Sequence, residues 1–429
     1  ADLKVGFVHR AGSVLERELD DVLEALEMYR SALAIDPSHK PSLDALTRIS
    51  QLADYREQAA EILEPLPRAQ GMHDGLAALL QLRADGTGDP FEKKTILRQL
   101  AETHEQGRNN PNAAFDTLRQ ALAEDSSDED VQNDIERLAG SLGLWSAAAD
   151  TFMARASNSL DPVVGRGLFV RTARIAEEHL GDDARAVTAT QRALEQVGDE
   201  PELLATLDRL HEKTANWTAL GDVLERRVST VDDPQERIGL LLRLGALRNE
   251  RFEDLRGAFA AYQEVVENEP GNATALGVLE TLTENPGLAS DVVEVLDTAY
   301  RAEGRNDKVL ELYDIRIRLA DSDGERVRML QDAAQIWEQD LGDRGRALGS
   351  MRRAFELDPR DEGILSDVER LAEASGSWES LRGMVESVTK GNDVDSMLTR
   401  DLNLRAAGWY RDKLGDAAAA EASLRASLR

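Results

Sequence analysis

Apolar positions recur along the chain in one short pattern that appears six times. Each copy has a small residue, usually a large apolar residue four positions later, and a small or β-branched residue with an apolar neighbour three positions further on. Spacings of three and four place these side chains on one face of a helix. The copies end at Leu33, Leu122, Leu194, Val266, Phe355 and Leu428. Their spacing is nearly constant apart from two longer steps, and a period of this kind predicts a repeat architecture.

Within one period the pattern predicts two antiparallel helix hairpins. The first hairpin turns at Leu-Gly-Asp in residues 180–182, 341–343 and 414–416, where Gly suits a left-handed helix end and Asp suits the cap of the next helix. A second, looser hairpin follows. Its second helix begins at Trp145, Trp217 or Trp378, each at the same offset from the second small residue of the recurrent pattern. We interpret these tryptophans as core side chains between hairpins and not as ligand-stacking residues.

Two steps, from Leu33 to Leu122 and from Val266 to Phe355, exceed the regular period by enough for one helix and its turn. These insertions are expected near residues 65–89, where residues 73–83 form a short helix, and near residues 288–320. The favoured interpretation is a local change of superhelix curvature. A docking ledge and a contact with another copy of the chain are the alternatives.

The composition supports an all-α fold, because 41% of residues are apolar, only 4% are aromatic, and no segment alternates with the period of a strand. The hairpins have small residues at close contacts and an acid-Pro pair after the second helix. In these features they resemble the tetratricopeptide repeat (TPR), and the resemblance is strongest in residues 25–37, 258–270 and 347–359. The resemblance implies an α-solenoid of stacked antiparallel hairpins in one continuous right-handed superhelix over residues 1–429, which binds other proteins. The family's Lys/Asn/Arg clamp for acidic tails has no counterpart at the equivalent first-helix positions.

Charge narrows the classes of partner. The chain has 81 acidic and 51 basic residues, a net charge of −30. This balance excludes nucleic-acid binding and adsorption to anionic membranes as leading functions. Most basic residues are Arg, which is typical of GC-rich coding and favours a bacterial source. No apolar run is long enough to cross a membrane, no signal peptide is visible, and a cytoplasmic location is favoured without being fixed.

The sequence contains no recognisable motif of a catalytic, cofactor-binding or metal-binding site. Without cysteine, disulfides and thiolate sites are excluded. We find no phosphate-binding loop, no His pair at metal-ligand spacing and no nucleophile elbow, so we expect no catalytic residues, no cofactor and no metal.

The sequence therefore predicts a non-catalytic protein–protein interaction scaffold. The alternatives are the regulatory or substrate-recruiting arm of an enzyme whose catalytic domain lies outside these residues, and a self-assembling structural protein. Since the chain begins at Ala1 within a helical pattern and ends within the last repeat, we expect a piece of a longer protein.

Carboxylates are the candidate contact residues. Residues 123–136 contain seven acids and no base. A helix start near residues 127–130 accounts for several of these acids, because carboxylates are favoured at helix N-termini. The alternative interpretation is a docking patch for a basic segment. On the inner face of the first helices we expect one acidic groove that binds protein partners with basic segments, with a homo-oligomer also possible. The candidate residues are Glu102, Glu105, Glu177, Glu178, Glu250 and Glu338.

Overall fold

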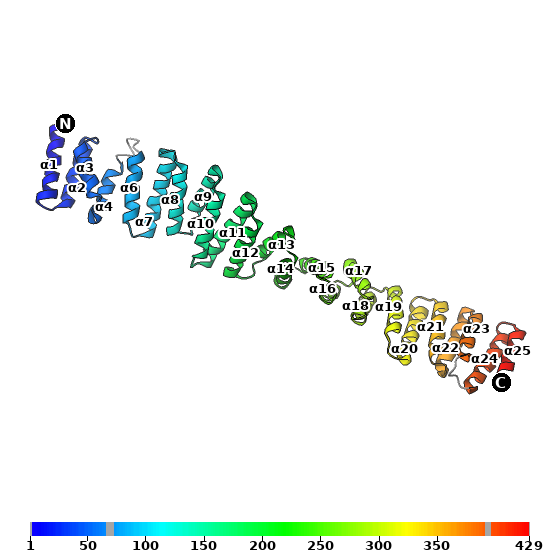
Figure 1. Cartoon of the computed structure of the whole chain (residues 1–429). Coiled ribbons are helices and arrows are strands. Elements are labelled where there is room, and N and C mark those ends of the chain that lie inside the picture. Colours follow the sequence, from blue (N-terminus) through cyan, green and yellow to red (C-terminus); the bar gives the residue numbers. More distant parts are fainter. Residues whose placement is uncertain (1, 66–72, 391–395, 429) are drawn as a thin grey trace. The chain divides into compact units, whose positions relative to one another are not determined.

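A computed structural model describes residues 2–65, 73–390 and 396–428, and every regular element in these ranges is helical. The all-α prediction is confirmed. The chain divides into two compact units, Ala1–Thr230 and Val231–Arg429, and successive helices within each unit pack as stacked antiparallel hairpins (Figure 1). The division falls between the third and fourth repeats.

The first unit contains three repeats. The helices of the first repeat are α1 (Asp2–Glu18), α2 (Val22–Ile35), α3 (Lys40–Ile49), α4 (Arg56–Leu63) and α6 (His73–Gly86), with a 3-10 turn at Ala53–Tyr55. Those of the second repeat are α7 (Pro90–Glu102), α8 (Pro111–Glu124), α9 (Glu129–Leu142) and α10 (Trp145–Ser157). Those of the third repeat are α11 (Pro162–Ile175), α12 (Asp183–Val197), α13 (Pro201–Lys213) and α14 (Trp217–Thr230).

The second unit contains the fourth, fifth and sixth repeats. The fourth comprises α15 (Pro234–Glu250), α16 (Leu255–Asn268), α17 (Ala273–Leu282), α18 (Ala289–Ala302) and α19 (Asn306–Leu319). The fifth comprises α20 (Asp323–Gln335), α21 (Arg344–Leu357), α22 (Glu362–Ser375), a 3-10 turn at Trp378–Ser380 and α23 (Leu381–Thr389). The sixth comprises α24 (Ser396–Asp412) and α25 (Ala417–Ala426).

Each predicted insertion contains a helix beyond the four of the regular repeat. Helix α6 covers the predicted residues 73–83, and residues 66–72 of the same insertion lie outside the described residues. In the second insertion α18 is the regular fourth helix, and α19 is the addition.

The turn chemistry of the first hairpins explains why their helices end where they do. Gly181, Gly342 and Gly415 have positive φ, between 64° and 69°, as the sequence predicts. The Asp after each glycine caps the next helix; Asp182, for example, accepts a hydrogen bond from the Arg185 N–H at 2.9 Å. The equivalent turn in the other three repeats uses a left-handed residue that is not glycine. These residues are Asp20, Asn109 and Glu253, with φ of 56°, 49° and 54°.

The recurrent pattern forms the core in the first five repeats, whereas Leu424 and Leu428 of the sixth copy are exposed. The leading Ala residues of those five copies, including Ala114 and Ala258, are fully buried, and the core residues around them are mainly Leu, Ile, Val and Ala. Small residues on the first helices permit close packing, because a Cβ added to Gly245 would lie 2.9 Å from the Tyr262 ring. A Cβ added to Gly12 would lie equally close to the Tyr29 ring.

The predicted core role of the tryptophans is confirmed for Trp378 and, in part, for Trp145, which packs against the hydrophobic core of its unit. Trp378 is buried, donates its indole N–H to Glu373 at 2.8 Å, and lies with its ring centroid 6.0 Å from that of Trp409. Trp145 and Trp217 are only half-buried. Each is the first residue of its helix, and Trp145 stacks in parallel on His179 at 3.7 Å between centroids.

Candidate protein-interaction surfaces

Within the described residues, four repeats share an ion pair that joins the first helix of one hairpin to the first helix of the next. In the second repeat, Arg137 of α9 donates two hydrogen bonds to Glu105, at 2.6 and 2.8 Å. Two parallel N–H···O bonds between a guanidinium and a carboxylate fix both the distance and the orientation. We call this contact the interhairpin ion pair. Its members are separated by 32 residues in Glu16–Arg48, Glu105–Arg137, Glu177–Arg209 and Glu338–Arg370.

Three of these glutamates lie in an unusual backbone turn. Helices α7, α11 and α20 each continue into a single π-helical turn, at Thr103–Gly107, Ala176–Leu180 and Ile336–Asp340. Glu16 makes the same pair from α1, which has no such turn. The π-helical turn is therefore not required for the ion pair.

The arginines keep their partner glutamates ionised. Hydrogen bonds from Arg137, Arg209 and Arg370 lower the pKa values of their partners below the usual range. Burial of the carboxylates acts in the opposite direction and is the smaller effect. The partner residues are Glu105, Glu177 and Glu338.

The structure divides the six predicted contact residues into two groups. Glu105, Glu177 and Glu338 already bind an arginine of the same chain, whereas the side chains of the other three are exposed. The exposed residues are Glu102, Glu178 and Glu250. A basic partner that binds Glu105, Glu177 or Glu338 must compete with an intramolecular arginine. Binding of a partner by any of the six glutamates stays a prediction.

Glu102 and Glu105 line a hollow of about 520 Å³ beside α7 and α9. The same hollow contains Lys94, Arg98 and Arg137, so its lining carries both signs of charge. This mixture differs from the acidic groove that the sequence predicts. Lys94 and Arg98 lie on the first helix α7 itself, and Arg137 is added by the third helix α9.

The acidic run of residues 123–136 is largely neutralised by its neighbours. Lys94 of α7 lies 2.8 Å from Asp125 and 2.9 Å from Asp128, and Glu136 pairs with Arg171 of α11 at 2.7 Å. The side chain of Asp128 also caps α9, as the helix-start interpretation predicts. The acids of this run therefore join α9 to α7 and α11, and few remain for a docking patch.

The fourth repeat has neither an acid nor a base at the positions of the interhairpin ion pair. The positions equivalent to the interhairpin ion pair are Asn249 and Thr281, and Thr281 donates its hydroxyl to the carbonyl of Val278 in its own helix. Ala289 replaces the tryptophan at the start of the fourth helix, and α19 follows.

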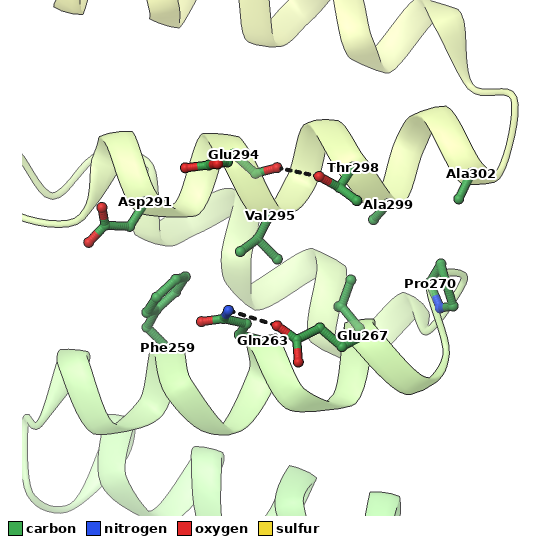
Figure 2. A pocket seen from close by; sticks show the side chains of 11 residues that line it. Phe259, Gln263, Glu267, Pro270, Asp291, Glu294, Val295, Thr298, Ala299 and Ala302 are labelled. Atoms are coloured by element: carbon green, nitrogen blue, oxygen red, sulfur yellow. Dashed lines mark hydrogen bonds between the residues drawn. The ribbon is translucent and has the colours of Figure 1, made fainter.

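The same repeat contains a hollow of about 640 Å³ between α16 and α18 (Figure 2). Its apolar floor consists of Phe259 and Val266 of α16 and of Val295 and Ala299 of α18, all buried except Val295, which is half-buried. The rim is acidic. It contains Glu267 on α16 and Asp291 and Glu294 on α18.

The carboxylates of this rim have no basic neighbours in the hollow. No Lys or Arg is among the described residues that line it. Glu267 accepts a hydrogen bond from the Gln263 amide at 2.8 Å, and within the described part of the chain no ion pair involves Glu267, Asp291 or Glu294 (Figure 2). The backbone carbonyl of Glu294, not its carboxylate, accepts the Thr298 hydroxyl at 3.0 Å. The sequence gives only a weak signal for this site, in the irregular spacing near residues 288–320.

Two further features bear on function. Among the residues that the structure describes, no group of three or more His, Asp or Glu side chains is arranged to hold a metal ion. In the same ranges, no helix has both the length and the hydropathy of a membrane span.

Comparison with known proteins gives distant similarities. The chain is 24% identical over 350 residues to cellulose synthase operon protein C of Xanthomonas axonopodis pv. citri, which covers 68% of this chain and 23% of that protein. The chain thus spans less than a quarter of its curated relative. No family model matches.

Among solved structures, PilF of Pseudomonas aeruginosa has 16% identity and a TM-score of 0.24, and covers 53% of this chain and 99% of its own. A tetratricopeptide repeat protein from Parabacteroides merdae has 11% identity and a TM-score of 0.25, with coverages of 65% and 99%. Identities and TM-scores at this level identify no partner and no activity.

Proposed function

We propose that this chain is a non-catalytic scaffold that organises a larger assembly through protein–protein contacts. The observation that carries the proposal is the repeated hairpin with its interhairpin ion pair, which fixes the register of successive helices in four repeats. A fixed register presents the exposed faces of many helices as a preformed surface, and a preformed surface lowers the entropic cost of binding. The resemblance to the tetratricopeptide repeat favours the same role.

The partner class follows from charge. With a net charge of −30, the chain favours proteins with basic segments and disfavours nucleic acids. The similarity to cellulose synthase operon protein C extends over 23% of that protein, so we infer from it a shared helical segment and not a shared activity. The second candidate function is the recruiting arm of an enzyme whose catalytic domain lies outside these residues.

Cross-linking mass spectrometry tests the scaffold proposal. The purified chain is incubated with a native extract of its source, cross-linked and digested. We expect one or a few stoichiometric partners whose cross-links map to a contiguous set of helices. Cross-links scattered over all surfaces at substoichiometric levels, or a catalytic activity of the isolated chain, would contradict the proposal.

A further inference from the structure

We propose that the hollow between α16 and α18 is a docking site for an amphipathic helical segment of a partner protein, with apolar side chains on the floor and Lys or Arg against the rim. This inference rests on the proposed scaffold function and assigns one contact surface and one partner chemistry to it. The site consists of the four apolar floor residues and the three rim carboxylates described above.

The dimensions of the hollow favour a helix as the occupant. Helices α16 and α18 contain 14 residues each, so each is about 20 Å long. Phe259 and Val266 are seven positions apart on α16, and Val295 and Ala299 are four apart on α18, so apolar contacts repeat along both walls at helical spacing. Side chains that recur at the same helical spacing on a partner helix can pack into the groove between α16 and α18.

Charge favours a basic partner over a second copy of the chain. Glu267, Asp291 and Glu294 have no arginine or lysine among the described residues of the hollow, so an approaching Lys or Arg does not have to displace an intramolecular cation. A second copy would bring a net charge of −30 to an acidic rim. Complementary charge at the rim of an interface mainly raises the association rate and the specificity.

The third repeat provides a matched control, because its positions correspond to those of the fourth repeat one regular period later. Glu195 and Asp222 of the third repeat are the counterparts of Glu267 and Glu294, and both are exposed. The counterpart of Ala299, however, is Arg227, which pairs with the buried Asp208. The third repeat thus has the two equivalent acids and keeps three apolar floor positions, as Val187, Leu194 and Val223, but has Arg227 in place of Ala299.

The probe is a synthetic fluorescent peptide of about 18 residues, with Leu and Phe along one helical face and Lys and Arg beside it. A scrambled peptide of identical composition lacks the apolar face. Binding to the full chain is measured by fluorescence anisotropy at about 50 mM and about 300 mM salt, since screening separates charge from apolar contact. We expect the patterned peptide to bind more tightly than the scrambled peptide at both salt concentrations.

Four variants, two of them controls, locate the binding site. The double variant Glu267→Gln/Glu294→Gln removes two rim charges. The double variant Glu195→Gln/Asp222→Asn removes the two equivalent charges of the third repeat. We expect the first pair to weaken binding by about tenfold and the second by less than about twofold. Thr298→Arg, at an exposed position, should fill the hollow and abolish binding, whereas Thr298→Ala should retain it.

Circular dichroism checks that every variant keeps its helical content. Equal weakening by the two charge pairs, or equal binding of the patterned and scrambled peptides, would overturn the docking site by showing general attraction to an acidic chain. Binding unaffected by Thr298→Arg would overturn it as well. A negative result for the docking site does not contradict the scaffold function if cross-links from a partner map to other helices. The two proposals can therefore be tested independently.

Discussion

The second and fourth repeats contain equivalent helices but use their carboxylates differently. In the second repeat, Glu105 is bound to Arg137, and the acids around Asp128 are paired with bases of adjacent helices. In the fourth repeat, Asn249 and Thr281 replace the ion pair, while Glu267 and Glu294 surround an apolar hollow without a base among its described residues. Acidic composition alone therefore does not identify a contact surface. The paired acids hold helices together, whereas the unpaired acids are the ones that we propose for contact with a partner.

The largest expected effect tests the close packing of the fourth repeat. Gly245→Ala should destabilise the second compact unit by about 1–3 kcal/mol, the usual cost of overpacking a core, because the new Cβ would meet the Tyr262 ring at 2.9 Å. The second repeat has Ala101 at the equivalent position and Leu118 in place of the tyrosine. Chemical denaturation followed by circular dichroism measures the change. A gain in stability, as expected for Ala in an unconstrained helix, would contradict the packing described here.

Breaking the ion pair of the second repeat should have a smaller, pH-dependent effect. Arg137→Gln should lower the stability by about 1 kcal/mol at neutral pH, a modest value because the guanidinium is half-exposed. The hydrogen bond from Arg137 lowers the pKa of Glu105 below its ordinary 4.5. The advantage of the wild type is therefore complete above pH 4.5 and disappears as the pH falls through the lowered pKa. Parallel denaturation curves for both proteins from pH 7 to pH 3 provide the check, and a constant difference across that range would disprove the linkage.

The converse substitution installs the pair where it is missing. Asn249→Glu/Thr281→Arg should stabilise the second unit by about 0.5 kcal/mol, the value of an exposed ion pair. Neither single substitution should do so, and a double-mutant cycle isolates the pair contribution. If the double variant gains nothing beyond the sum of the single ones, the backbone of the fourth repeat does not share the register of the second.

The smallest expected effect concerns the turn before α16. Glu253 has φ of 54°, in the left-handed region that the equivalent Gly181 adopts without a Cβ. Glu253→Gly should therefore raise stability by about 0.5 kcal/mol, since relief of strain exceeds the added freedom of the unfolded chain. Gly181→Ala in the third repeat is the reverse control and should lower stability by about 1 kcal/mol. Thermal melts of both variants decide the outcome, and the same sign of change in both would refute the explanation.

The sequence predicts the helices and turns well because these depend on local chemistry. The period of the recurrent pattern locates the added helices α6 and α19, and Gly-Asp pairs locate the ends of three first helices. The interhairpin ion pair joins residues 32 positions apart, and the sequence alone does not reveal it. The predicted contact residues all belong to first helices, so the prediction does not include the arginines of the third helices that bind half of them.

The fourth-repeat hollow was missed for a related reason. Its floor and rim belong to α16 and α18, the second helices of two successive hairpins, whereas the predicted groove lay on first helices. The incomplete burial of Trp145 and Trp217 has a similar origin. Their constant offset from the recurrent pattern predicts their place at a helix start, but the degree of burial there depends on tertiary packing.

The most direct test of the central contrast is hydrogen exchange of the full chain with and without the patterned basic peptide. Amides slow their exchange where a ligand covers or stabilises a helix. We predict new protection in residues 255–268 and 289–302, the ranges of α16 and α18, and none in residues 90–142 of the second repeat. Protection centred on the second repeat, or spread evenly over all acidic helices, would contradict the account.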